Sequence, residues 1–130
     1  MPTKYRLSQL IGHNEGYGIK GAIPTVRNNP GDLKHSNHSS HVGIGPNDIG
    51  IIDTVEHGWE DLDRQLEIFA AEGLTLAEMV NVYLGWLKDA PMDDSIVDGN
   101  HRAPYLSSLT TGLSLPPEAT VAQALLIPPK

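Results

Sequence analysis

The stretch from residue 16 to residue 54 constrains the fold most, because it interrupts a chain that otherwise shows helical patterning. Glycine, proline and asparagine punctuate it, most densely in Asn28-Asn29-Pro30-Gly31 and Gly45-Pro46-Asn47. These residues favour turns and disfavour long helices. We predict two short strands within it, around Asp32 to Lys34 and around Ile49 to Asp53. So long an irregular stretch inside a compact domain is usually functional.

An apolar face at helical spacing predicts a first helix from Lys4 to about Asn14, directly before this stretch. Gly16 is expected to end that helix. Glu15 then lies at the carboxyl end, where the helix macrodipole is negative and a carboxylate is disfavoured. We therefore expect the pKa of Glu15 to be raised.

Helical periodicity returns after residue 54, where apolar residues recur at steps of three and four. This pattern is typical of a helix that faces a core. Asp53 is expected to cap its start, in a capping box with Glu56. A second capping box, Thr75 to Glu78, opens another helix, and shorter helices are expected after Pro104 and Pro117. The core-facing residues of the first of these helices are Trp59, Leu62, Leu66 and Phe69.

Together these patterns predict one domain over residues 1–130, of the α+β class but mostly α, with a small β-lobe after the first helix and a helical lobe. A chain of 130 residues is long enough for one core. Its formal net charge of -7, with only 9 Lys and Arg, argues against nucleic-acid binding. No apolar run reaches the length of a membrane span. We expect a monomer with a ligand cleft between the two lobes.

The order of motifs resembles that of the lysozyme-like superfamily of peptidoglycan hydrolases and lytic transglycosylases. A helix ending in Glu15 is followed by Gly16-Tyr17-Gly18 and then by Arg27-Asn28-Asn29-Pro30-Gly31-Asp32-Leu33. The latter string looks like that of phage and prophage members. Later Gly58-Trp59 and the pair Asn100 and Tyr105 also fit the pattern.

The resemblance implies a lysozyme-like fold and an enzyme that cleaves the β-1,4 bond between N-acetylmuramic acid and N-acetylglucosamine. It implies that Glu15 is the general acid and base, and that no cofactor is needed. The partner would be the peptidoglycan glycan strand. The expected substrate-binding residues are Tyr17, Asn28, Asn29, Asp32, His35, Asn100 and Tyr105.

A second carboxylate is less clearly marked in the sequence. Asp32, Asp48 and Asp53 are candidates, although Asp53 suits a helix cap and Asp48 suits a turn. A hydrolase normally uses such a group as nucleophile or base. A lytic transglycosylase uses one glutamate, because the 6-hydroxyl of the muramic acid attacks. The choice between the two reactions stays open.

His35, His38 and His41 stand at a spacing of three and offer an alternative reading. Three imidazoles could hold zinc with one position left for water, as in a metal-dependent hydrolase. A polar loop that contacts backbone or sugar explains the same residues without metal. A third reading is a non-catalytic wall-binding or virion module.

The start of the chain has no apolar segment of the kind found in a signal peptide. For an enzyme that acts on the cell wall, this predicts synthesis in the cytoplasm. Release, injection or virion delivery would then bring the protein to its substrate.

Overall fold

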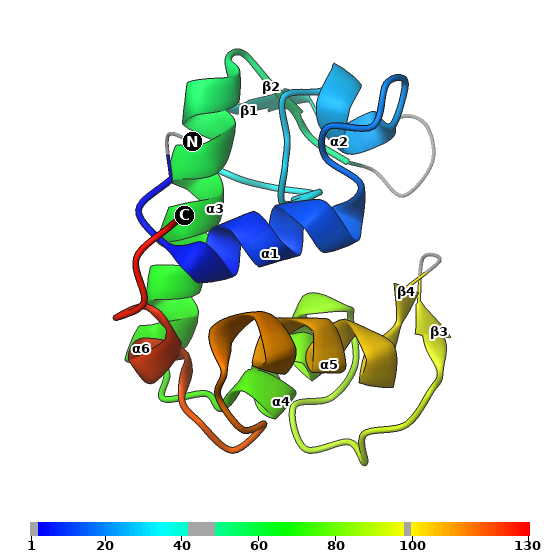
Figure 1. Ribbon diagram of the computed structural model, residues 1–130. Helices are drawn as coiled ribbons and strands as arrows, with labels where there is room; N and C mark the ends of the chain where they lie inside the picture. Colours follow the sequence, from blue (N-terminus) through cyan, green and yellow to red (C-terminus); the bar gives the residue numbers. More distant parts are fainter. Residues whose placement is uncertain (1–2, 42–48, 98–99) are drawn as a thin grey trace.

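The computed structural model describes residues 3–41, 49–97 and 100–130, and it is mostly helical (Figure 1). This agrees with the predicted class, α+β but mostly α. The elements in chain order are α1 (Arg6–Glu15), α2 (Ile23–Val26), β1 (Ser39–His41), β2 (Ile51–Ile52), α3 (Val55–Ala71), α4 (Leu76–Tyr83), β3 (Ile96–Val97), β4 (Asn100–His101), α5 (Arg102–Leu113) and α6 (Val121–Ala124).

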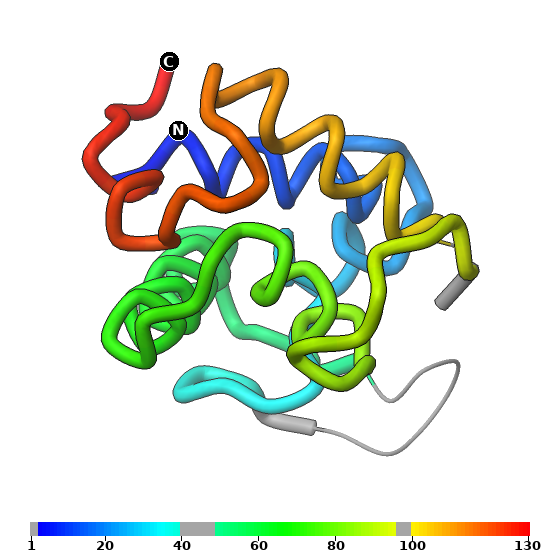
Figure 2. Tube along the Cα trace, turned by 90° about the horizontal axis from the view of Figure 1, so that it is seen from below, coloured from blue at the N-terminus to red at the C-terminus, as the bar shows by residue number. Residues whose placement is uncertain are grey.

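Helix α3 is the longest element, and the other elements are distributed along it (Figure 1). Helix α2 and the β1–β2 pair lie toward its N-terminal end, whereas α4, α5 and α6 lie toward its other end. Helix α1 contacts both α3 and α5, so it lies between these two groups of elements. The C-terminal segment returns to α1 (Figure 2), where Gln9 exchanges hydrogen bonds of 3.0 and 2.9 Å with the backbone of Lys130.

The strands form two short antiparallel pairs within the described residues. β1 pairs with β2, with Ser39 opposite Ile52, and β3 pairs with β4. The strand predicted at 49–53 is therefore confirmed by β2. The strand predicted at Asp32 to Lys34 is wrong, because Asp32 has a φ of 55° that turns the chain out of an extended course.

The core is built from the apolar faces that the sequence pattern marks. Trp59 is 1% exposed, and Leu62 and Leu66 are fully buried. Phe69 is also buried, so Trp59 and Phe69 are confirmed as core residues. Every helix among the described residues is too short or too polar to cross a membrane.

The helix ends follow local chemistry, with one correction. The Thr75–Glu78 capping box is confirmed, with both reciprocal hydrogen bonds present. The cap of α3 is Thr54 rather than Asp53, because the Thr54 hydroxyl accepts the backbone N–H of His57 at 3.1 Å. Asp53 instead accepts from the Thr54 backbone at 2.9 Å. The predicted first helix is confirmed as α1, and Gly16 closes it in the left-handed region with a φ of 92°.

Candidate active site

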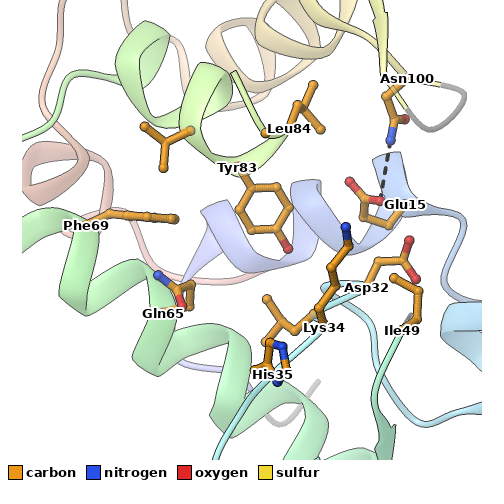
Figure 3. Close-up of a pocket in the computed structure, with 13 residues that line it drawn as sticks. Glu15, Asp32, Lys34, His35, Ile49, Gln65, Phe69, Tyr83, Leu84 and Asn100 are labelled. Atoms are coloured by element: carbon orange, nitrogen blue, oxygen red, sulfur yellow. Dashed lines mark hydrogen bonds between the residues drawn. The ribbon is translucent and has the colours of Figure 1, made fainter. Parts of the chain in front are cut away.

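Glu15 lies at the carboxyl end of α1, where two later elements reach its side chain. The Tyr105 hydroxyl, on α5, donates to Oε2 of Glu15 at 2.7 Å. The Asn100 side-chain amide, on β4, donates to Oε1 at 3.5 Å (Figure 3). Each carboxylate oxygen therefore accepts from at least one described donor, and these two donors come from 85 and 90 residues further along the chain.

Tyr105 is suited to act as a permanent donor to Glu15. It is 4% exposed, and burial raises the pKa of its hydroxyl well above 10. The nearby negative charge of Glu15 raises that pKa further. The hydroxyl therefore keeps its proton across the physiological range and continues to donate to the carboxylate.

A cavity of about 630 Å³ opens beside Glu15. Its size lies within the range typical of small-molecule sites. Figure 3 shows Glu15, Asp32 and Tyr83 around the same space. The polar lining residues are Glu15, Asp32, Lys34, His35, Gln65, Tyr83 and Asn100, and the others are Leu33, Ile49, Phe69, Val82, Leu84 and Gly85.

A second cavity of about 340 Å³ shares three lining residues with the first. The shared residues are Leu33, His35 and Gln65. The two hollows therefore adjoin along the 33–35 segment and α3.

Tyr83 connects the two sides of the larger cavity. Its hydroxyl donates to the carbonyl oxygen of Gly31, so the end of α4 is held against the turn that carries Asp32. The ring also meets Phe69 edge-on, with centroids 6.3 Å apart. Burial raises the pKa of the Tyr83 hydroxyl well above 10, so it stays a donor. Tyr83 therefore contributes both to the packing around the core and to the lining of the cavity.

Asn28 and Asn29 stabilise the wall of the cavity through hydrogen bonds to the backbone. Asn29 is fully buried, and its side-chain amide donates to the carbonyls of Leu33 at 2.8 Å and Gly50 at 2.9 Å. Its oxygen accepts the Leu33 N–H at 2.9 Å. Asn28 donates to the Ile52 carbonyl at 3.1 Å. These bonds tie the 28–33 turn to the β2 segment, and the predicted contact of both asparagines with substrate stays a prediction.

The structure brings only some of the predicted residues to one place. Glu15, Asp32, His35 and Asn100 line the larger cavity, and Tyr105 joins them through its bond to Glu15. Tyr17 is half-buried and packs edge-on against Trp59, with ring centroids 5.3 Å apart. Tyr17 is not among the described residues that line the larger cavity, and its predicted role in substrate binding stays a prediction.

The three candidate second carboxylates lie in different surroundings. Asp32 shares the cavity with Glu15. Asp53 lies at the start of α3, exposed, with its carboxylate on the His57 ring. Asp48 lies outside the described residues. Of the described candidates, Asp32 is thus the one placed to meet the same ligand as Glu15.

In the described part of the chain, the side chains of His35 and His38 lie in different surroundings. His35 lines the cavity, whereas His38 turns to α3 and contacts Asp61 at 2.6 Å. The close group of potential metal-ligand atoms comprises His38, His57 and Glu60, without His35. The side chain of His41 lies outside the described ones. The sequence pattern missed His57 because its partner is 19 residues away.

Sequence reasoning also missed two polar residues that line the cavity. Lys34 reaches the cavity from the segment after Asp32, and Gln65 reaches it from α3 (Figure 3). Lys34 lies between the candidate residues Asp32 and His35 in the sequence, and this position was the available signal. Gln65 belongs to the Arg64-Gln65-Leu66 stretch, which also fits the motif pattern of the resemblance, but it was not predicted as a binding residue.

Comparisons with family models, with curated protein sequences and with solved structures gave no match to this chain. The case for a function therefore rests on the residues and their geometry.

Proposed function

We propose that this protein cleaves the glycan strands of peptidoglycan, with Glu15 as general acid and base. The observation that carries the proposal is the setting of Glu15. It lies at a cavity of about 630 Å³, at a helix carboxyl end, with two fixed donors on its carboxylate. The resemblance of the sequence motifs to lysozyme-like enzymes points to the same residue.

Cleavage begins with proton transfer from the Glu15 carboxyl to the glycosidic oxygen, as the bond from that oxygen to C1 breaks. Glu15 becomes a carboxylate in this step. The hydrogen bonds from Tyr105 and Asn100 stabilise the charge that develops on its oxygens. Both donors are already in place before the reaction, so they lower the barrier without reorganisation.

Two forms of the second step are compatible with a single glutamate. In hydrolysis, water adds to C1 and gives its proton to the Glu15 carboxylate. In transglycosylation, the 6-hydroxyl of the muramic acid adds to C1, and its proton goes to the same carboxylate. Asp32 lines the cavity and is placed to assist the cationic centre in either form. In both forms Glu15 ends the cycle protonated.

The arrangement of elements supports a polymeric sugar as the substrate. The adjoining cavities run between the 31–35 segment on one side and α3 with the end of α4 on the other. The lining combines polar groups with the apolar side chains of Phe69, Val82 and Leu84, a mixture that suits sugar rings. We propose that this is a lysozyme-like fold with its cleft between the two groups of elements.

The test is digestion of purified peptidoglycan by wild type and by Glu15→Gln, with mass analysis of the products. We expect wild type to release disaccharide muropeptides and Glu15→Gln to lose at least roughly 100-fold in rate, the lower end of the range for general acid–base catalysis. Glu72→Gln is the matched control, because Glu72 also ends a helix, α3, but is exposed and outside the cavity. This control is expected to keep full activity.

The products decide between the two reactions. A muramic acid that is lighter by one water marks transglycosylation, and a reducing end marks hydrolysis. Full activity of Glu15→Gln, or release of peptide fragments alone, would overturn the proposed mechanism.

A further inference from the structure

A second chemical cluster lies on the outside of α3, apart from the cavity at Glu15. It joins His38, which precedes β1, to His57 and Glu60 in the first two turns of α3. One potential ligand atom from each of these residues lies within 4.8 Å of the others. Two segments that are distant in sequence therefore present two imidazoles and a carboxylate at one point.

The positions of these side chains are fixed by the local structure. His57 and Glu60 are three residues apart on a helix, so they project from the same face. The Thr54 cap fixes the first turn that carries His57. The backbone N–H of His38 donates to Oδ2 of Asp61 at 3.0 Å, which holds its segment against α3.

Each imidazole is oriented by a carboxylate at its Nδ1 atom. Oδ1 of Asp61, which is 3% exposed, lies 2.6 Å from Nδ1 of His38. Oδ1 of Asp53 lies 2.7 Å from Nδ1 of His57. Carboxylates orient metal-binding histidines in this way, and the contacts leave Nε2 of each ring to bind the ion.

The electrostatic setting favours a cation. Asp53, Asp61 and Glu60 place three carboxylates around two imidazoles, whose rings stack in parallel with centroids 3.8 Å apart. Protonation of both stacked rings would bring two positive charges together. A metal ion would supply the positive charge at one point shared by both rings.

We propose that His38, His57 and Glu60 bind a divalent transition metal ion of the zinc type. Two imidazole nitrogens and a carboxylate oxygen form a ligand set that Zn²⁺ commonly takes, with water completing the coordination. The ion clamps the 35–39 segment to α3. Because His35 lines the cavity three residues before His38, the clamp also stiffens that wall. This proposal does not depend on the proposed glycan-cleaving activity.

The experiment uses the whole chain, stripped with EDTA, dialysed, and titrated with ZnCl₂ by calorimetry. We expect saturable binding of one Zn²⁺ per chain and a rise in Tm with zinc concentration, since an ion that binds only the folded state stabilises it. Co²⁺ in place of Zn²⁺ should give visible absorption bands from the bound ion. Absence of saturable binding would overturn the proposal.

Variants locate the site. His57→Ala and Glu60→Gln should each weaken zinc binding by roughly 10-fold or more, and Asp53→Asn should weaken it by about 10-fold through loss of orientation. Glu60 is exposed, so Glu60→Gln should leave the metal-free Tm unchanged and remains informative if a histidine variant unfolds.

His101→Ala is the matched control, because its ring has the same Nδ1–carboxylate pairing, with Asp94 at 3.0 Å, but lies outside the cluster. It should bind zinc as wild type does. Binding that survives in His57→Ala and Glu60→Gln but is lost in His35→Ala or His41→Ala would place the ion elsewhere and refute this ligand set.

Discussion

Two tyrosines, Tyr105 and Tyr5, each donate a hydroxyl hydrogen bond to a glutamate, but only one of these pairs lies at the cavity. Tyr105 donates to Glu15, whereas Tyr5 donates to Glu67 on the surface of α3. The pair at the cavity lies where the proposed reaction places developing charge. The two pairs therefore allow a comparison between a hydrogen bond to the proposed catalytic residue and one of the same type away from it.

Tyr105→Phe is expected to lower the rate of glycan cleavage by roughly 10- to 100-fold, because a hydrogen bond to a charged group contributes about 1.5–3 kcal/mol. Since the bond favours the charged form of Glu15, its loss should also move the alkaline fall in activity to higher pH. Rates measured across pH for wild type and variant check both effects.

Tyr5→Phe is the control for this experiment, because it removes the same type of bond far from the cavity. It should lower the Tm slightly and leave the pH profile of activity unchanged. Equal profiles for wild type and Tyr105→Phe would show that Tyr105 does not act on the proton of Glu15.

At the level of elements, α3 packs so closely against the turn at residues 28–31 that there is no room for a side chain at Gly58. A Cβ built on Gly58 would lie 2.0 Å from the carbonyl oxygen of Asn28 and 2.8 Å from the ring of Pro30. Only glycine allows the helix to approach the turn so closely. Asp32 directly follows this turn. The contact between the helix and the turn therefore helps to set the position of the cavity wall.

Gly58→Ala is expected to destabilise the protein by about 1–3 kcal/mol, because overpacking against backbone outweighs the gain in helix propensity. Gly112→Ala, in α5, is the matched control. There the added Cβ meets only the flexible end of the Leu10 side chain, at 2.6 Å. Gly112→Ala should lose less free energy of unfolding than Gly58→Ala, as measured by urea unfolding. Equal stability of Gly58→Ala and wild type would contradict the described contact.

At the scale of the whole molecule, the cavity depends on links between segments that are remote in the chain. The Tyr83 hydroxyl joins α4 to the carbonyl of Gly31, 52 residues away. Arg102, 1% exposed, joins Asn81 at 2.6 Å to Asp93 at 2.8 Å and lies over the Trp86 ring. The Tyr83 bond holds the helical side of the cavity against the turn-rich side, and the Arg102 contacts tie segments of the helical side to one another.

Tyr83→Phe tests the link across the cavity. We expect a loss of about 1–3 kcal/mol in the free energy of unfolding, since the Gly31 carbonyl would lose its partner in a buried setting. Activity should fall as well, because the two walls would no longer be held together. Chemical unfolding and activity assays on the same variant check this. An unchanged free energy of unfolding together with unchanged activity would show that Tyr83 does not hold the two walls together.

The sequence by itself determined the parts of the molecule that depend on near neighbours. The apolar face of α3, the Thr75–Glu78 cap and the end of α1 at Gly16 all follow from residues within a few positions of one another. The mostly helical class follows from these patterns. The sequence also placed Glu15 at a helix end, because that position depends only on local chemistry.

Only the tertiary structure decided which side chains meet. The motifs predicted Glu15, Asn100 and Tyr105 as site residues but not the contacts between them. The fold places the Asn100 and Tyr105 donors on the carboxylate of Glu15. The alternative reading of the histidine string grouped His35, His38 and His41, whereas the ring of His38 stacks on that of His57 from another element. The physical reason is that such contacts join residues tens of positions apart. Local periodicity contains no information on which helices and turns pack together.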